Sequence, residues 1–239
     1  QIKKIYGGLN WNPEMRSPLT EPGINAAVGD YILAVNGKEV TAAQNLFSFF
    51  ENTSGKIVEL TIGANPDMTG SRVVKVEPVG NEGALRNRDW VEGNLKKVTA
   101  ATNGQVAYVY VPNTANQGHE YFKRYFYPQA NRKAVIIDER FNSGGQIPDR
   151  FIELLNRPLR NFWGVRDGKD WPWPPVGHSG PKAMLMNGWS GSGGDCFPFY
   201  FKHRGLGPLI GTRTWGGLVG ISGNPNLIDG AVVTVPTFG

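Results

Sequence analysis

Two glycine-rich loops, each set between a buried strand and a helix, constrain the fold of this chain most. The first runs from Asp138 to Gly145 (DERFNSGG) after the apolar run Ala134 to Ile137. The second runs from Asn187 to Asp195 (NGWSGSGGD) after Lys182 to Met186. Continuous apolar strands that alternate with helices are typical of a sheet covered on both faces. Loops that follow such strands gather at one edge of the sheet, so we expect an α/β domain with its site at these loops.

Other apolar segments complete this second domain. Residues 84–103 are polar and charged, and we place the domain boundary near residue 84. The prolines of Trp171 to Pro175 keep that stretch extended, and we expect a packed surface loop there. The remaining predicted elements are strands over 105–111 and 209–211 and helices over 119–127, 149–155 and 196–202.

The first third of the chain predicts a small β-rich unit. Gly29 to Gly37 (GDYILAVNG) is an apolar strand that ends in Asn-Gly, the strongest short hairpin signal. Thr41 is expected to be the N-cap of a helix over 42–51, and strands are expected over 56–63 and 71–78.

This order of elements resembles a PDZ domain over about residues 5–83, although another small β-barrel with an Asn-Gly hairpin would share the pattern. The resemblance implies that the unit binds a peptide by letting it extend an exposed sheet edge. The loop that receives the peptide end is expected at Leu19 to Gly23, between two strands.

Ser192 is the candidate nucleophile. Glycines flank it, so the chain can bend sharply from strand to helix and leave the hydroxyl accessible. The residues alone also allow a plain loop serine, or a phosphate cradled by the loop N–H groups. The loops match neither the P-loop nor the dinucleotide fingerprint. The α/β-hydrolase elbow is not matched either, because position 190 is serine.

Three motifs lie in or beside the two loops: Asp138 to Gly145, Ser190 to Pro198 and Gly205 to Ile221. They resemble the tricorn branch of the tail-specific serine peptidases. The resemblance implies residues 1–83 as the PDZ-like domain and 84–239 as a C-terminally incomplete, crotonase/ClpP-like α/β peptidase domain, an α+β fold overall. Carried over by motif, Ser192 is the nucleophile, and the N–H of Gly193 with that of Gly144 or Gly145 forms the oxyanion hole.

In relatives of this branch the general base is a histidine, paired with a second serine, before the PDZ domain, and a glutamate follows the Gly217 motif. Neither can be assigned here. The chain has no start methionine and both ends look cut, so we expect a fragment that is inactive by itself. No lysine follows Ser192 in the window used by lysine-dyad relatives, which contains Arg213. The three histidines are expected to be surface or capping residues: His119, His178 and His203.

Other polar residues near the loops have structural interpretations. Asp195 is expected to cap the helix after Ser192, and Asp138 to pair with Arg140. The family's carboxylate that selects basic substrate side chains has candidates by region only, Asp167 and Asp170.

Composition narrows the classes further. Hydrophobic residues make up 40% and charged residues 19%, which excludes a disordered chain. The net charge is +5, but the basic residues are scattered, so we expect no nucleic-acid partner. We also expect no membrane span, no metal and no cofactor. The only cysteine, Cys196, suits a small buried apolar position.

The resemblance implies a serine endopeptidase that cleaves peptides or unfolded polypeptides through an acyl-enzyme. The alternatives are a non-catalytic PDZ-type peptide-binding module and a phosphate binder. The resemblance implies a homo-oligomer when the protein is full length, in the cytoplasm or exported.

Overall fold

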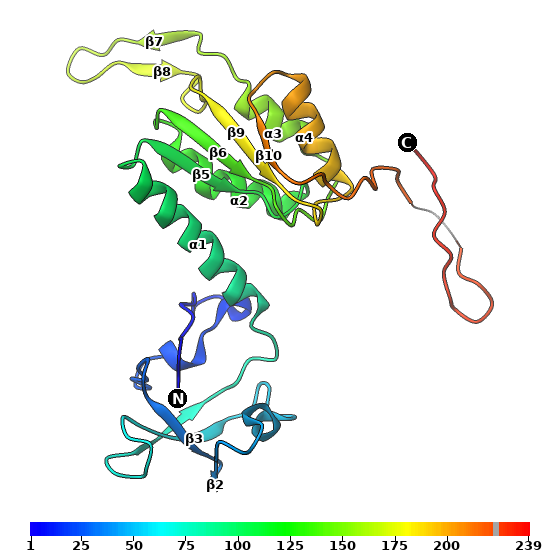
Figure 1. The fold of residues 1–239 in the computed structure, drawn as a ribbon. Coiled ribbons are helices and arrows are strands. Elements are labelled where there is room, and N and C mark those ends of the chain that lie inside the picture. Colours follow the sequence, from blue (N-terminus) through cyan, green and yellow to red (C-terminus); the bar gives the residue numbers. More distant parts are fainter. Residues whose placement is uncertain (222–224) are drawn as a thin grey trace. The chain divides into compact units, whose positions relative to one another are not determined.

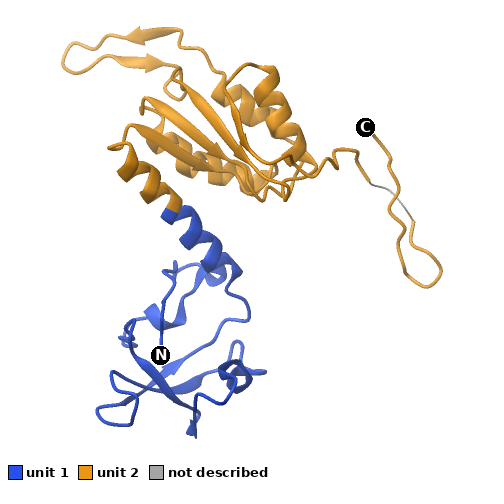
Figure 2. Ribbon diagram, in the orientation of Figure 1, with its two compact units in different colours: residues 1–93 blue, residues 94–239 orange. Residues whose placement is uncertain are grey.

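The computed structural model describes residues 1–221 and 225–239 and divides the chain into two compact units, 1–93 and 94–239 (Figures 1 and 2). The division falls inside helix α1. None of the helices in the described residues is long and apolar enough to cross a membrane. In unit 1 the elements are η1 (Pro13–Met15), η2 (Pro18–Thr20), β1 (Tyr31–Val35), β2 (Lys38–Glu39), η3 (Leu46–Phe50), β3 (Val58–Gly63), β4 (Arg72–Val76) and the start of α1 (Gly83–Ala101).

Unit 1 is built on an antiparallel sheet with strand order β2-β1-β3-β4. The predicted hairpin is confirmed, because Asn36 and Gly37 both have positive φ, 49° and 74°, and join β1 to β2. Alternate apolar residues of the strands form the core together with Ile24. The core members are Ile24, Val35, Val58, Leu60, Ile62, Val74 and Val76.

The predicted helix over 42–51 is wrong. Only Leu46–Phe50 is helical, as a 3₁₀ turn, and Asn45 caps it by accepting from the N–H of Phe47. Gln44 accepts from the N–H of Thr41, which makes a separate turn before it. An asparagine that binds the backbone two residues on competes with helix formation, so the apolar spacing did not extend into an α-helix.

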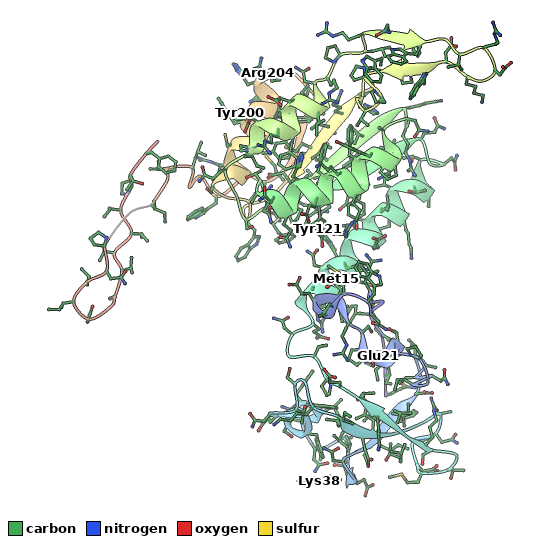
Figure 3. The ribbon with its side chains drawn as sticks, turned by 180° about the vertical axis from the view of Figure 1, so that it is seen from behind. Met15, Glu21, Lys38, Tyr121, Tyr200 and Arg204 are labelled. Carbon is green, nitrogen blue, oxygen red and sulfur yellow. The ribbon has the colours of Figure 1, made fainter. Side chains whose placement is uncertain are left out.

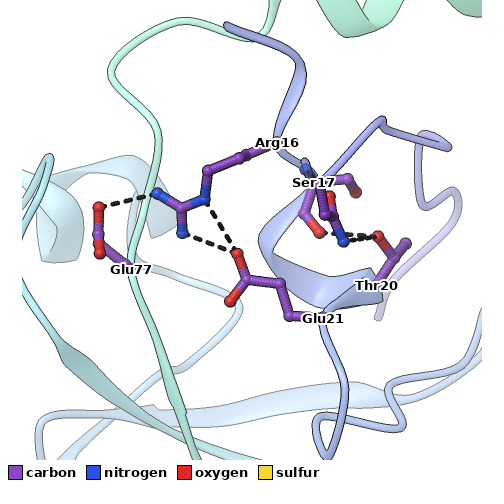
Figure 4. Close-up of polar contacts among 6 residues, drawn as sticks. Arg16, Ser17, Thr20, Glu21 and Glu77 are labelled. Carbon is purple, nitrogen blue, oxygen red and sulfur yellow. Dashed lines mark hydrogen bonds and ion pairs between the residues drawn. The ribbon is translucent and has the colours of Figure 1, made fainter. Parts of the chain in front are cut away.

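The segment before β1 is held by polar contacts rather than by strands (Figure 4). Arg16 donates to Glu21 at 2.7 Å and to Glu77 at 2.8 Å. Leu19 lies in η2 and packs against the core, and Gly23 has φ +86°. The described residues before Leu19 form no strand, so Leu19 to Gly23 does not lie between two strands as expected.

Residues 83–101 form the helix α1, in a polar and charged stretch for which no helix was predicted. Only Leu85 and Val91 are buried in it, so the chain carries almost no apolar period to reveal it. Ion pairs one turn apart support it instead, between Glu82 and Arg86 and between Arg88 and Glu92.

Unit 2 contains a fully parallel sheet with strand order β10-β9-β6-β5, which confirms the predicted α/β domain. Tyr110 pairs with Asp138, and Asp138 pairs with Leu185, so the carboxyl ends of these strands lie side by side. The loops that follow them therefore gather at one edge. The elements of unit 2 are β5 (Val106–Tyr110), α2 (Asn116–Phe126), η4 (Tyr127–Gln129), β6 (Ala134–Asp138), α3 (Pro148–Leu155), β7 (Asn161–Trp163), β8 (Trp171–Trp173), β9 (Lys182–Met186), α4 (Gly193–His203) and β10 (Leu209–Gly211).

Buried aromatic rings join three helices of unit 2. Phe122 of α2 meets Phe151 of α3 edge-on at 5.3 Å between ring centroids, and Phe151 meets Phe197 of α4 at the same distance. All three rings are fully buried. The helices were predicted, but α4 begins at Gly193, three residues before the expected start.

Residues 161–173 form a two-stranded hairpin, β7 and β8, instead of a packed loop (Figure 1). Trp163 stacks on Trp173 with centroids 4.7 Å apart. Asp167 and Asp170 lie in the loop that connects β7 to β8.

Candidate active site

Ser192 occupies a strained turn between β9 and α4. Its φ is 58° and its ψ −118°, values that L residues other than glycine rarely adopt. The N–H of Gly194 donates to the oxygen of Gly191 at 2.8 Å and closes the turn around Ser192. The residue is exposed. A sharp strand-to-helix turn with an exposed hydroxyl is the arrangement that nucleophilic serines adopt on α/β sheets.

The structure brings the two predicted glycine-rich loops together. The N–H of Gly191 donates to the oxygen of Asn142 at 3.0 Å. Gly144 lies so close that an added Cβ would be 2.7 Å from the Cβ of Ser192. Gly144 also has φ +86°, so both space and backbone conformation require glycine there.

The backbone N–H groups near Ser192 are not equivalent. The N–H of Gly144 donates to the side chain of Asn142 at 2.9 Å and is therefore committed. The N–H groups of Gly193 and Gly145 have no hydrogen-bond acceptor among the described residues. Gly193 is the first residue of α4, where N–H groups have no partner within the helix. Of the three glycines predicted for an oxyanion hole, two therefore offer a free donor.

A third loop supports these two and was missed in the sequence. The N–H of Thr114, which follows β5, donates to the oxygen of Gly144 at 2.9 Å. A Cβ added at Gly193 would lie 2.0 Å from the Thr114 hydroxyl oxygen. The available signal was position, because Thr114 follows a buried parallel strand as the two glycine-rich loops do.

Ser192 lies in the wall of a cavity of about 590 Å³. Tyr200, labelled in Figure 3, comes from α4, and most of the other side chains are apolar. Asp149 is the one carboxylate among the described lining residues, and Asp167 and Asp170 are not among them. The lining residues are Gly145, Gln146, Pro148, Asp149, Ser192, Gly193, Cys196, Tyr200, Trp215, Gly217, Leu218, Val219, Gly220, Ile221 and Phe238.

In the described part of the chain, no histidine hydrogen-bonds the Ser192 hydroxyl. His203 stacks on Phe199 in the last turn of α4, about 16 Å along the helix at 1.5 Å per residue. His178 binds the oxygen of Arg132 at 2.8 Å, before β6 begins. His119 packs edge-on against Phe151, and burial lowers its pKa.

The structure contradicts the role predicted for Asp195 and confirms the one predicted for Asp138. Asp195 does not cap α4, because the N-cap residue of this helix is Ser192. The carboxylate of Asp195 instead accepts a hydrogen bond from the N–H of Gly216 at 2.7 Å. The Asp138–Arg140 pair is confirmed, with oxygen–nitrogen distances of 2.6 and 2.9 Å. Asp138 also accepts from the Tyr108 hydroxyl at 2.7 Å, so it is held as a structural group.

Two further observations limit the chemistry of the described residues. Cys196 is buried, as predicted for a small apolar position. No group of three His, Cys, Asp or Glu side chains among residues 1–221 and 225–239 is arranged to hold a metal ion.

Comparison with known proteins gives matches for both units. Residues 1–81 match the family model described as the tricorn protease PDZ domain. Residues 105–239, more than half of the chain, match the model of peptidase family S41.

Individual relatives agree with these matches. The chain is 34% identical to the tricorn protease of Thermoplasma acidophilum over 99% of its own length. It is 35% identical to the putative tricorn-like protease C-terminal subunit of Sulfurisphaera tokodaii over 100% of its length. The crystal structure of the tricorn protease matches with a TM-score of 0.88, at 34% identity over 99% of this chain and 23% of that one.

The chain spans only 22% and 27% of the lengths of those two relatives. Nevertheless, most of each unit and the motif around Ser192 fall within the residues matched by the family models, 1–81 and 105–239. The chain belongs to peptidase family S41, in its tricorn protease-like branch, and combines a PDZ-like domain with an S41 peptidase domain.

Proposed function

We propose that this protein hydrolyses peptide bonds with Ser192 as the nucleophile. The observation that carries the proposal is the exposed serine held at φ 58° in a strand-to-helix turn beside two uncommitted N–H groups. Backbone strain of this kind costs about 1–3 kcal/mol and persists where the surrounding structure imposes it, often at reacting groups. Membership of peptidase family S41 supports peptide bonds as the substrate class.

The reaction follows from the positions of these groups. The Ser192 oxygen attacks the carbonyl carbon and loses its proton to a base. The N–H groups of Gly193 and Gly145 donate to the oxygen that becomes negative. The C–N bond then breaks, the amine leaves with the proton, and water hydrolyses the ester left on Ser192. The cavity of about 590 Å³ beside Ser192 supplies a largely apolar place for a substrate side chain.

The general base is part of the proposal. Because no described histidine reaches Ser192, we place the base on another part of the native protein. The 239 residues by themselves are then expected to be inactive. Hydrolysis by this chain alone, lost in Ser192→Ala, would contradict that assignment of the base.

The nucleophile is tested by comparing two serine variants of the protein as isolated from its source. Ser192→Ala is expected to lower kcat/KM for a peptide substrate by at least about a thousandfold. Ser143→Ala is the matched control, because Ser143 is an exposed serine of the other loop, and it should stay near wild type. Equal activity of Ser192→Ala and wild type would rule out the proposal.

A second function, peptide binding by unit 1, is favoured by the match to the tricorn PDZ model. Its sheet has β4 at one edge, where Val73 is 61% exposed, and a peptide strand can pair with such an edge. The involvement of Leu19 and Gly23 belongs to this proposal. Calorimetric titration of the chain with an unstructured peptide should give the same affinity in wild type and Ser192→Ala. Absence of any binding would refute this second function and leave the first untouched.

A further inference from the structure

A carboxyl group that the proposed reaction does not use is buried beneath both loops. Glu139 directly follows β6, and its side chain is 0% exposed. Neither carboxyl oxygen has a hydrogen-bond partner among the described residues. The hydroxyl of Ser190 donates elsewhere, to the main-chain oxygen of Glu139 at 2.8 Å. A buried carboxylate with no donor or cation is so costly that the group normally keeps its proton instead.

The main chain of Glu139 is connected to both loops. Its oxygen accepts from the N–H of Asn142 at 3.0 Å as well as from Ser190. Asn142 then accepts from the N–H of Gly191 and, through its side chain, from that of Gly144. Gly144 and Gly191 both adjoin Ser192. Two successive hydrogen bonds, through Asn142, therefore connect the main chain of Glu139 to each of the two glycines beside Ser192.

The charges that face the carboxyl are negative. Asp195 acts on it from α4, and Asp138 acts from the end of β6, where it is already paired with Arg140. None of the ion pairs in the described residues involves Glu139. Burial raises the pKa of Glu139 most, the two aspartates add to the rise and the adjacent Ser190 hydroxyl opposes it, so that the pKa is brought to about 9.

We propose that Glu139 is a positioning residue for the nucleophile loop, which the fold holds as an uncharged carboxylic acid and whose ionisation loosens both loops. The effect of Glu139 on hydrolysis rests on the proposed function of Ser192 as the nucleophile. The protonation state of Glu139 does not depend on that function, so the proposal for Glu139 and the proposal for Ser192 can fail separately.

Proton linkage tests the protonation state. The folded chain keeps a proton that the unfolded chain releases above its ordinary pKa, so stability falls as pH rises between about 5 and 9. Urea unfolding is followed by tryptophan fluorescence, since five of the seven tryptophans lie in unit 2. Relative to Glu139→Gln, the wild-type unfolding constant should rise by up to about tenfold per pH unit. The control Glu153→Gln removes an exposed carboxylate of α3 and should follow wild type.

A pH-independent difference between wild type and Glu139→Gln would overturn the proposal. If Glu139→Gln does not fold, infrared spectroscopy of wild type decides the question. A carboxylic-acid C=O band is expected at pH 7 in the folded chain and should disappear on thermal unfolding. Its absence from the folded chain would overturn the proposal as well.

The positioning role has its own readout in the native protein. Peptide hydrolysis by wild type should decline above about pH 9, whereas Glu139→Gln should retain its rate there. A purely structural glutamate would lower the rate equally at all pH values in the variant. The same decline of the hydrolysis rate above about pH 9 in wild type and in Glu139→Gln would therefore refute the positioning role. It would do so even if the unfolding experiment shows that Glu139 is protonated in the folded chain.

Discussion

At the scale of single residues, the site depends on backbone conformations that the neighbouring side chains impose. Ser192 has a positive φ in a turn that is closed by the hydrogen bond from the N–H of Gly194 to the oxygen of Gly191. Gly144 packs closely against the Cβ of Ser192 on the other side of this turn. Glycine adopts this conformation without a Cβ penalty. Ser192→Gly should therefore raise the free energy of unfolding by about 1 kcal/mol while removing the nucleophile. Ser143→Gly, at an ordinary φ, should not be stabilising, and urea unfolding distinguishes the two.

At the next position, Gly193, a substitution is expected to lower the free energy of unfolding. A Cβ there would lie 2.0 Å from the Thr114 hydroxyl and 2.3 Å from the oxygen of Gly145. Such distances require the backbone of the Gly145 loop to shift, so Gly193→Ala should cost about 2–3 kcal/mol of unfolding free energy. Circular dichroism and urea unfolding measure this directly. A Gly193→Ala protein as stable as wild type would mean that the three loops are not packed as described.

The meeting of the two glycine-rich loops was the more predictable part of the site. Each of the two motifs, one with Gly144 and one with Ser192 and Gly193, is a short continuous segment that follows a buried strand. Their meeting at one edge of the sheet could therefore be predicted from the order of strands and helices. Thr114 and the buried carboxyl of Glu139 were not predictable in this way. Their importance comes from contacts between segments far apart in the chain, which local patterns do not encode.

At the scale of elements, the outer strand β5 depends on one side chain. Gln129 accepts from the N–H of Tyr108 at 3.3 Å and donates to the oxygen of Tyr108 at 3.0 Å and of Tyr125 at 2.6 Å. The amide thus pairs with the edge of the sheet as another strand would. Gln129→Met should cost at least about 2 kcal/mol, because it leaves buried polar groups unpaired. Gln105→Met, at an exposed position, is the control, and equal stability of the two variants would contradict this account.

Helix α1 shows why some elements could not be predicted. Strands β6 and β9 are continuous apolar runs, and their burial follows directly from the sequence. Helix α1 buries only two residues and is supported by ion pairs on its surface. Gly93 lies inside it with nothing within 4 Å of an added Cβ. Gly93→Ala should therefore stabilise the chain by about 0.5–1 kcal/mol, and a loss of stability would argue against a helix there.

At the scale of the whole molecule, the chain contains two compact units with separate cores. Their fold types were predictable because each has a distinct strand pattern, antiparallel with a tight hairpin in unit 1 and parallel with helices in unit 2. Assembly into a homo-oligomer and the cellular compartment stay predictions. Both concern surfaces and signals that the folding pattern of a single chain does not specify.

The central claim is that Ser192 is the nucleophile of a peptidase, and covalent capture tests it most directly. The protein isolated from its source is treated with a fluorophosphonate, which bonds to activated serine oxygens, and the adduct is mapped by mass spectrometry. We predict one adduct, on Ser192, together with the loss of peptide hydrolysis. Hydrolysis that continues without an adduct, or an adduct on another serine that abolishes it, would contradict the claim.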